Sequence, residues 1–278
     1  MDATTLEPSR VAGHALSMPT SDGAKSTSYE RLHHIMAAAE DRSGPCAAQV
    51  FGLLRGQGMQ IRSVLDVGCG LGSWLAAARD ALGAEVLGVD GPWTNLDLLR
   101  IDRARFQVAD LEKPLSLGRS FDLAISVEVG EHLPAEAAPV LVASLTQHAP
   151  VVLFSAAIPG QGGISHVNEQ WPAYWATRFA EHGFGCFDVL RPILWERSDV
   201  DWWYKQNLLL FVHEARAAEA GVRLELGSPE TPRRLVHPDV FAVRCPARNI
   251  DIFYENGTAK GRYWECDRET GELRDGGR

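Results

Sequence analysis

Residues 64–72 read VLDVGCGLG, a short and mostly apolar run that passes directly into three glycines in alternate positions. A short apolar run bounded by glycines is typical of a buried strand, so residues 63–67 are expected to form one. Residues 73–82 follow with apolar side chains at helical spacing. The stretch predicts a strand, a glycine turn and a helix, the unit with which many nucleotide-binding sheets begin.

The same alternation continues along the chain. Further strands are expected at residues 85–89, 104–109, 121–127 and 151–155, and helices at about 134–148 and at 169–182. Alternating strands and helices predict an α/β fold with a mostly parallel sheet. Residues 184–193 and 206–214 are also strand-like, with no helix expected between them, so these two segments should pair antiparallel.

Both ends of the chain differ from this pattern. Residues 1–28 are rich in small and polar residues and are expected to form a flexible tail. Residues 29–40 and 47–54 have helical spacing and should form a helical cap before the core. The predicted domain therefore spans residues 29–214, and residues 215–278 are expected to form an extension over its surface.

Composition restricts the possible partners. The formal net charge is -9 and no dense basic stripe is present, which argues against nucleic acid as a partner. The five cysteines are scattered without a CxxC pair, so neither a disulfide framework nor a metal site is expected. No apolar run has membrane-spanning length. We expect a cytoplasmic protein without membrane contact that acts on a small molecule.

Carboxylates follow three of the expected strands. Asp66 lies beside the glycine turn, Asp90 ends the second strand and Asp110 ends the third. A carboxylate at this turn would repel a pyrophosphate but attract a ligand with positive charges. Each also has a structural interpretation, such as a turn residue for Asp90 and a helix cap for Asp110. Three carboxylates at successive strand ends favour one shared site.

Three segments resemble the motifs of class I S-adenosylmethionine (SAM)-dependent methyltransferases. They are VLDVGCGLG at residues 64–72, VLGVD at 86–90 and FDLAISVEVGEHL at 121–133. The resemblance implies an enzyme with a Rossmann-like sheet of seven mostly parallel strands that ends in an antiparallel hairpin. Residues 164–172 (ISHVNEQWP) and 202–207 (WWYKQN) are similar to a bacterial subgroup associated with polysaccharide or secondary-metabolite methylation. Residues 215–278 depart from the family pattern.

The resemblance also implies a donor site for SAM, whose ammonium and sulfonium suit nearby carboxylates. Asp90 would accept both ribose hydroxyls, Asp110 the adenine amino group, and the Leu111 amide would donate to the adenine ring. The complete set of expected donor-binding residues is Asp66, Gly68, Gly70, Gly72, Asp90, Asp110, Leu111 and Glu128.

The proton of a hydroxyl acceptor needs a base. Three candidates follow the fourth and fifth strands: His166, Glu169 and His132. His166 follows a glycine-rich loop at residues 159–163 that could act as a lid. Glu169 could instead be the acidic residue expected at a helix start, and His132 could cap a helix or contact the donor.

Aromatic residues suggest an acceptor pocket. The expected substrate-binding residues are Trp171, Trp175, Trp202 and Tyr204, with core packing as the alternative for at least half of the aromatic residues in this part of the chain. If residues 202–204 lie on one strand, they cannot all point inward, because successive side chains alternate.

The predicted reaction is O-methylation of a hydroxyl on a sugar or secondary metabolite. One alternative is C-methylation of an isoprenoid, with Glu169 as base and aromatic faces stabilising a cation. Another is a non-catalytic SAM-binding partner subunit.

Overall fold

The computed structural model describes residues 42–219, 228–240, 248–255, 258–266 and 273–275. The predicted tail at residues 1–28 and the predicted helix at 29–40 lie outside the described residues.

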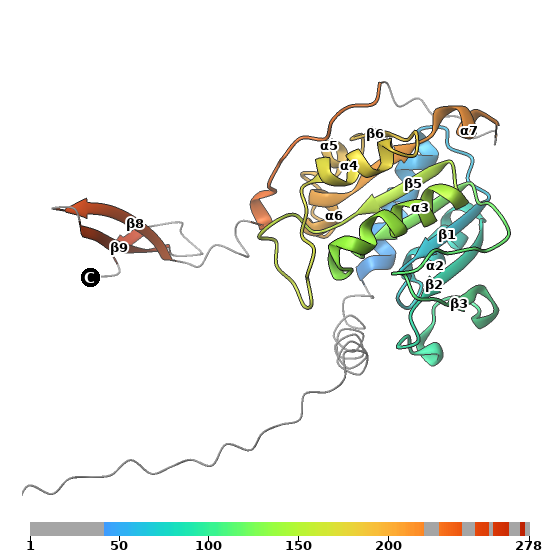
Figure 1. The fold of residues 1–278 in the computed structure, drawn as a ribbon, viewed down its shortest axis with the longest axis horizontal. Helices are drawn as coiled ribbons and strands as arrows, with labels where there is room; N and C mark the ends of the chain where they lie inside the picture. The colour runs from blue at the N-terminus through green and yellow to red at the C-terminus, as the bar shows by residue number, and fades with distance from the viewer. Residues whose placement is uncertain (1–41, 220–227, 241–247, 256–257, 267–272, 276–278) are drawn as a thin grey trace, which may run out of the picture.

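A seven-stranded sheet forms the centre of the molecule (Figure 1). Its order is β3-β2-β1-β4-β5-β7-β6, with β1 to β5 parallel and β7 antiparallel to both β5 and β6. The strands are β1 (Ser63–Val67), β2 (Glu85–Asp90), β3 (Phe106–Val108), β4 (Leu123–Val127), β5 (Val151–Ser155), β6 (Gly185–Phe187) and β7 (Leu209–Val212). The predicted α/β sheet with a reversed hairpin is confirmed.

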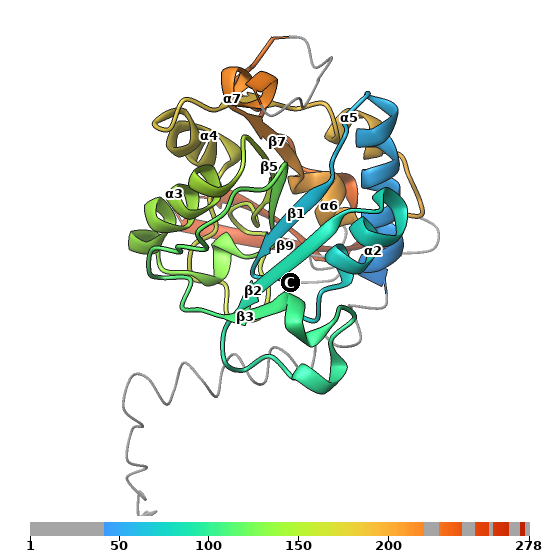
Figure 2. The ribbon, with the colours of Figure 1, turned by 90° about the vertical axis from the view of Figure 1, so that its right-hand side faces the viewer.

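Helices cover both faces of this sheet (Figure 2). Val151 and Leu153 of β5 pack in one core cluster with the helix over residues 42–56 and with α2, whereas Val152 and Phe154 face α3 and α4. Side chains alternate along a strand, so a strand covered on both faces must be apolar throughout. The helices are α2 (Ser73–Leu82), α3 (Ala138–His148), α4 (Pro172–Ala180), α5 (Arg191–Leu194), α6 (Trp202–Asn207) and α7 (Glu214–Glu219).

Helix boundaries follow local chemistry. Helix α2 ends at Gly83, whose φ of 66° is left-handed and whose N–H donates to the Arg79 carbonyl. Helix α4 begins at Pro172, where the missing N–H costs no helical hydrogen bond. The sequence predicted that this helix begins at Glu169, and the structure starts it three residues later.

Several predicted boundaries were wrong. The third strand covers only Phe106–Val108, because residues 103–105 form a 3-10 turn. The sixth strand ends at Phe187, and two short helices, α5 and α6, occupy part of the segment where no helix was expected. Residues 202–207 belong to α6 and not to a strand, so the alternation argument does not apply to Trp202–Tyr204.

Beyond β7 the chain forms α7 and then returns to the domain. Gln206 in α6 donates to the Leu235 carbonyl at 2.8 Å and accepts from the His237 N–H at 2.5 Å. A separate antiparallel sheet, which was not predicted, consists of β8 (Arg248–Glu255), β9 (Thr258–Cys266) and β10 (Leu273–Asp275). Among the described residues, no helix has the length and apolarity needed to span a membrane.

Candidate active site

The glycine turn lies at the carboxyl edge of the sheet. The Gly68 amide donates to the Val89 carbonyl at 2.8 Å, so the turn is attached to β2. Gly68 has a left-handed φ of 84°, and a Cβ there would lie 2.4 Å from Val129 Cγ2. Only glycine fits both the conformation and the space. The turn thus packs directly against the segment that follows β4.

Two buried carboxylates adjoin this turn. Asp66 is 3% exposed and Asp90 is 7% exposed. Asp90 accepts from the Gly70 amide at 2.7 Å and, through its other oxygen, from the amide of Gly91 at 2.6 Å. The Trp93 indole also donates to Asp90, at 3.2 Å. The sequence interpretation missed Trp93, since nothing but its place three residues after Asp90 marked it.

The end of β3 is more exposed. Asp110 accepts from the Glu112 amide at 3.0 Å and pairs with Lys113 at 2.9 Å, while Leu111 is half-buried. These contacts are those of a residue that caps a turn, which is the structural alternative to donor binding given above for Asp110.

Glu128 directly follows β4 and has a backbone conformation that few residues other than glycine adopt, at φ 56°. Its amide donates to Ser155 Oγ at 3.0 Å, and its carboxylate accepts from Asn207 at 3.0 Å and from Gln161 at 3.3 Å. Burial raises the pKa of the Glu128 carboxyl. The sequence predicted no role at the site for Asn207 or Gln161, although both lie in segments singled out above, residues 202–207 and 159–163.

The 3-10 turn Gly130–His132 follows Glu128. Trp175 packs beneath it, since a Cβ on Gly130 would lie 2.7 Å from the indole. Trp175 is 1% exposed and its ring centroid lies 4.9 Å from that of Phe154. Trp175 is therefore a core residue that supports this turn, contrary to the expectation that it binds substrate.

The loop after β5 lies against the same turn. Its Val167 and Asn168 amides both donate to the Glu131 carbonyl, at 2.8 and 3.0 Å. The His132 and His166 rings meet edge to face with centroids 4.9 Å apart. Burial and then the nearby His166 lower the pKa of His132 to about 4.

Glu169 organises this loop from within. It accepts from the Gly160 and Gly162 amides, at 2.8 and 2.5 Å, and from His166 Nδ1 at 2.9 Å. The carboxylate acceptor assigns the proton to Nδ1 of His166. Glu169 is thus a loop anchor rather than the first acidic residue of a helix.

The remaining aromatic residues divide into two groups. Tyr204 is 5% exposed, its hydroxyl is hydrogen-bonded to Ser43 at 3.0 Å, and burial raises its pKa to about 12. It is a core residue, again contrary to the expectation of substrate contact. Trp171 and Trp202 are half-buried, and Trp171 lies 5.7 Å from the Arg234 guanidinium.

The edge of the sheet thus combines a glycine turn, two buried carboxylates for a cationic ligand and a hydrogen-bonded His–Glu pair. With the strand order of the sheet, these features define the class I SAM-dependent methyltransferase fold. Residues 27–195, more than half of the chain, match the family of methyltransferase domains. The chain belongs to this family.

Individual relatives match shorter parts. A ubiquinone biosynthesis O-methyltransferase from Bartonella tribocorum is 36% identical over 76 residues, which is 25% of this chain and 30% of the relative. The chloroplastic tocopherol O-methyltransferase of Arabidopsis thaliana is 40% identical over 88 residues, 28% of this chain and 25% of the relative. The chain thus matches less than a third of the length of either relative.

Among solved structures, magnesium protoporphyrin IX methyltransferase from Synechocystis PCC 6803 is similar with a TM-score of 0.49. It shares 18% identity, and the match covers 69% of this chain and 93% of that chain.

Proposed function

We propose that this protein transfers the methyl group of SAM to a hydroxyl oxygen of a small-molecule acceptor. The observation that carries the proposal is the His166–Glu169 pair, joined at 2.9 Å on the loop that lies against the turn after β4. A neutral imidazole held by a carboxylate is suited to accept a proton near pH 7.

The donor side rests on the glycine turn and its buried acids. Gly68, Gly70 and Gly72 all have positive φ values, so the backbone can approach a ligand without Cβ interference. Asp66 and Asp90 would attract the charged end and the ribose of SAM. Asp110, Leu111 and Glu128 complete the proposed donor set.

In the proposed step, a lone pair of the acceptor oxygen forms a bond to the methyl carbon while the carbon–sulfur bond breaks. Its electron pair stays on sulfur, which leaves neutral S-adenosylhomocysteine, and the hydroxyl proton passes to His166. Holding the two reactants in line supplies a large part of such catalysis. His132 lies beside His166 and would fix the position of its ring.

Three points support an oxygen acceptor of small size. Glu169 already accepts from two backbone amides and from His166, so it is a poor free base for carbon methylation. The net charge of -9 opposes binding to a polynucleotide. The Bartonella and Arabidopsis relatives are named as O-methyltransferases, which agrees with oxygen, and Trp171 and Trp202 remain candidates for acceptor contact.

The proposal is tested by SAM calorimetry and by transfer of a labelled methyl group to a panel of phenols, catechols and hexoses. Asp90→Asn should weaken SAM binding about tenfold, since a charge-assisted hydrogen bond is roughly twice as strong as a neutral one. His166→Ala should leave SAM affinity nearly unchanged and lower turnover by about 10²–10⁴-fold. Asp97→Asn and His182→Ala, at exposed positions, are the matched controls.

Mass spectrometry of the product locates the methyl group. A product methylated only on nitrogen or carbon would contradict the oxygen assignment. Absence of SAM binding by the folded protein would contradict the proposal as a whole, and SAM binding without transfer to any acceptor would favour a partner subunit.

A further inference from the structure

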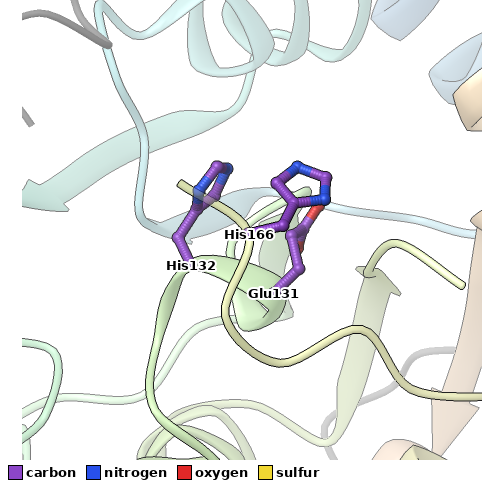
Figure 3. A group of neighbouring side chains, drawn as sticks. All are labelled: Glu131, His132 and His166. Atoms are coloured by element: carbon purple, nitrogen blue, oxygen red, sulfur yellow. The ribbon is translucent and has the colours of Figure 1, made fainter. Parts of the chain in front are cut away.

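Glu131, His132 and His166 bring three potential metal ligands together (Figure 3). One ligand atom from each residue lies within 4.8 Å of the other two. Glu131 and His132 follow β4, and His166 lies in the loop after β5, the neighbouring parallel strand. Residues distant in sequence thus meet at one edge of the sheet.

The Glu131 carboxylate points to a missing partner. Glu131 is 0% exposed, and its side-chain oxygens make no hydrogen bond of regular geometry within the part of the chain that the structure describes; the Ala157 backbone and the Glu128 carboxyl lie beside them. Its main-chain carbonyl accepts from Val167 and Asn168, so the residue is firmly held. A buried carboxylate without a partner is costly unless a cation or a proton compensates it.

His166 has the second contact that metal-binding histidines typically make. Its Nδ1 bonds to Glu169 at 2.9 Å, which orients the ring and leaves the other ring nitrogen to act as a ligand. Glu169 is itself fixed by the amides of Gly160 and Gly162. The ring packs so closely on Gly163 that a Cβ there would lie 2.2 Å from His166 Nε2.

We propose that Glu131, His132 and His166 bind one divalent first-row transition ion, with zinc as the best match. Two imidazoles and one carboxylate form the donor set of zinc sites that keep a fourth position open. Magnesium and calcium prefer oxygen ligands throughout. The open position would take an oxygen atom of the acceptor.

This inference goes beyond the proposed function, because it concerns what the cluster binds before an acceptor arrives. The sequence predicts no metal site, because the cysteines lack ligand spacing and no carboxylate cluster stands out beyond the acids assigned to SAM; neither pattern records a site assembled from two separate loops. In the metal-loaded protein the ion would bind the acceptor oxygen and make its hydroxyl more acidic, so that the proton would leave to water, and His166 would act as a ligand. His166 would serve as the base of the proposed function only in the metal-free protein.

The test uses the full chain, stripped with a chelator and titrated with Zn²⁺ by calorimetry and with Co²⁺ by visible absorption. One ion per chain should bind. Glu131→Gln, His132→Ala and His166→Gln should each weaken binding at least about tenfold, and Glu169→Gln, which removes the orienting partner, by about 10–100-fold. Glu136→Gln and His182→Ala, at exposed positions, should bind as the parent does.

Circular dichroism checks that each variant folds. If Glu131→Gln, at a buried position, does not fold, His166→Gln is the variant that tests the site. Failure of the folded parent to bind either ion would overturn the site, as would binding unchanged in folded His166→Gln and Glu169→Gln. An intense cobalt–thiolate band would assign the ion to a cysteine and also overturn it. Methyl transfer by a folded parent that binds neither ion would reject the site but not the proposed function. Ion binding without any methyl transfer would reject the proposed function but not the metal site.

Discussion

Gly68 carries two separate requirements, one conformational and one steric. Its φ of 84° disfavours any residue with a Cβ, and that Cβ would also collide with Val129. Gly58 has nearly the same φ, 83°, but has no atom within 4 Å of the corresponding Cβ position. The chain therefore contains an internal control for the conformational part alone.

Gly58→Ala should lower the free energy of unfolding by about 1–2 kcal/mol, the cost of a left-handed alanine. Gly68→Ala should cost a further 1–3 kcal/mol, roughly the penalty of overpacking, and should weaken SAM binding because the turn shifts. Urea denaturation and SAM calorimetry measure both effects. The double variant Gly68→Ala/Val129→Ala should recover part of the loss; equal stability of the two single variants would show that the collision relaxes without cost.

At the scale of elements, the loop between β5 and α4 is held in place from two sides. Its amides at Val167 and Asn168 bond to the turn after β4, and its own Glu169 holds the Gly160 and Gly162 amides. The glycines provide conformational freedom, and the Glu169 carboxylate holds the part of the loop that contains Gly160 and Gly162. Any opening of this predicted lid must break the Glu169 contacts first.

Glu169→Gln should therefore speed amide hydrogen exchange at Gly160 and Gly162, since a neutral amide is a weaker acceptor and offers one fewer oxygen. Exchange in β5 should not change. Mass spectrometry of the exchanged peptides makes the comparison, with exposed Glu181→Gln as control. Unchanged protection at both glycines would mean that the loop is held without the carboxylate.

At the scale of the whole molecule, one exposed carboxylate joins three segments at the amino ends of the strands, on the opposite side of the sheet from the glycine turn. Glu85 at the start of β2 bonds to Arg105 at 2.7 Å and to Arg119 at 3.0 and 3.1 Å. These contacts, first with Arg119 and then with Arg105, lower the pKa of Glu85 from 4.5 to about 2. A lowered pKa in the folded state stabilises the fold above pH 4.5, and this contribution is lost as the pH falls toward 2.

Glu85→Gln should thus flatten the decline in unfolding free energy between about pH 4.5 and 2, with a modest effect because solvent screens exposed pairs. Urea unfolding at a series of pH values measures it, and Glu136→Gln, also exposed, should keep the slope of the parent. A Glu85→Gln profile that superimposes on the parent profile would show that the arginine contacts contribute nothing to stability.

Individual strands and helices were predictable because the residues that specify each of them lie within one short segment. The strand at residues 63–67, the helix at 73–82 and the strand at 151–155 agree with the structure residue for residue, because apolar spacing and flanking glycines specify them within one short segment. Asp66 lies in the same segment as the turn, whereas Asp90 at the end of β2 reaches the turn through strand pairing. Residues 206 and 207 were assigned to the strand at 206–214 but belong to α6, because periodicity over so few residues does not separate a short helix from a strand.

The tertiary structure alone decided which side chains meet. Glu131 and His166 come together because β4 and β5 are neighbours whose carboxyl ends share one edge, and no spacing within a single segment records that adjacency. Trp175 and Tyr204 were expected at the acceptor site and are core residues, since burial depends on what packs against a side chain and not on its type. The sequence by itself determined the glycine turn and Asp66, where chemistry and geometry lie within one segment. The contact of Asp90 with the turn, and the cluster beside it, exist only because the sheet order brings separate segments together.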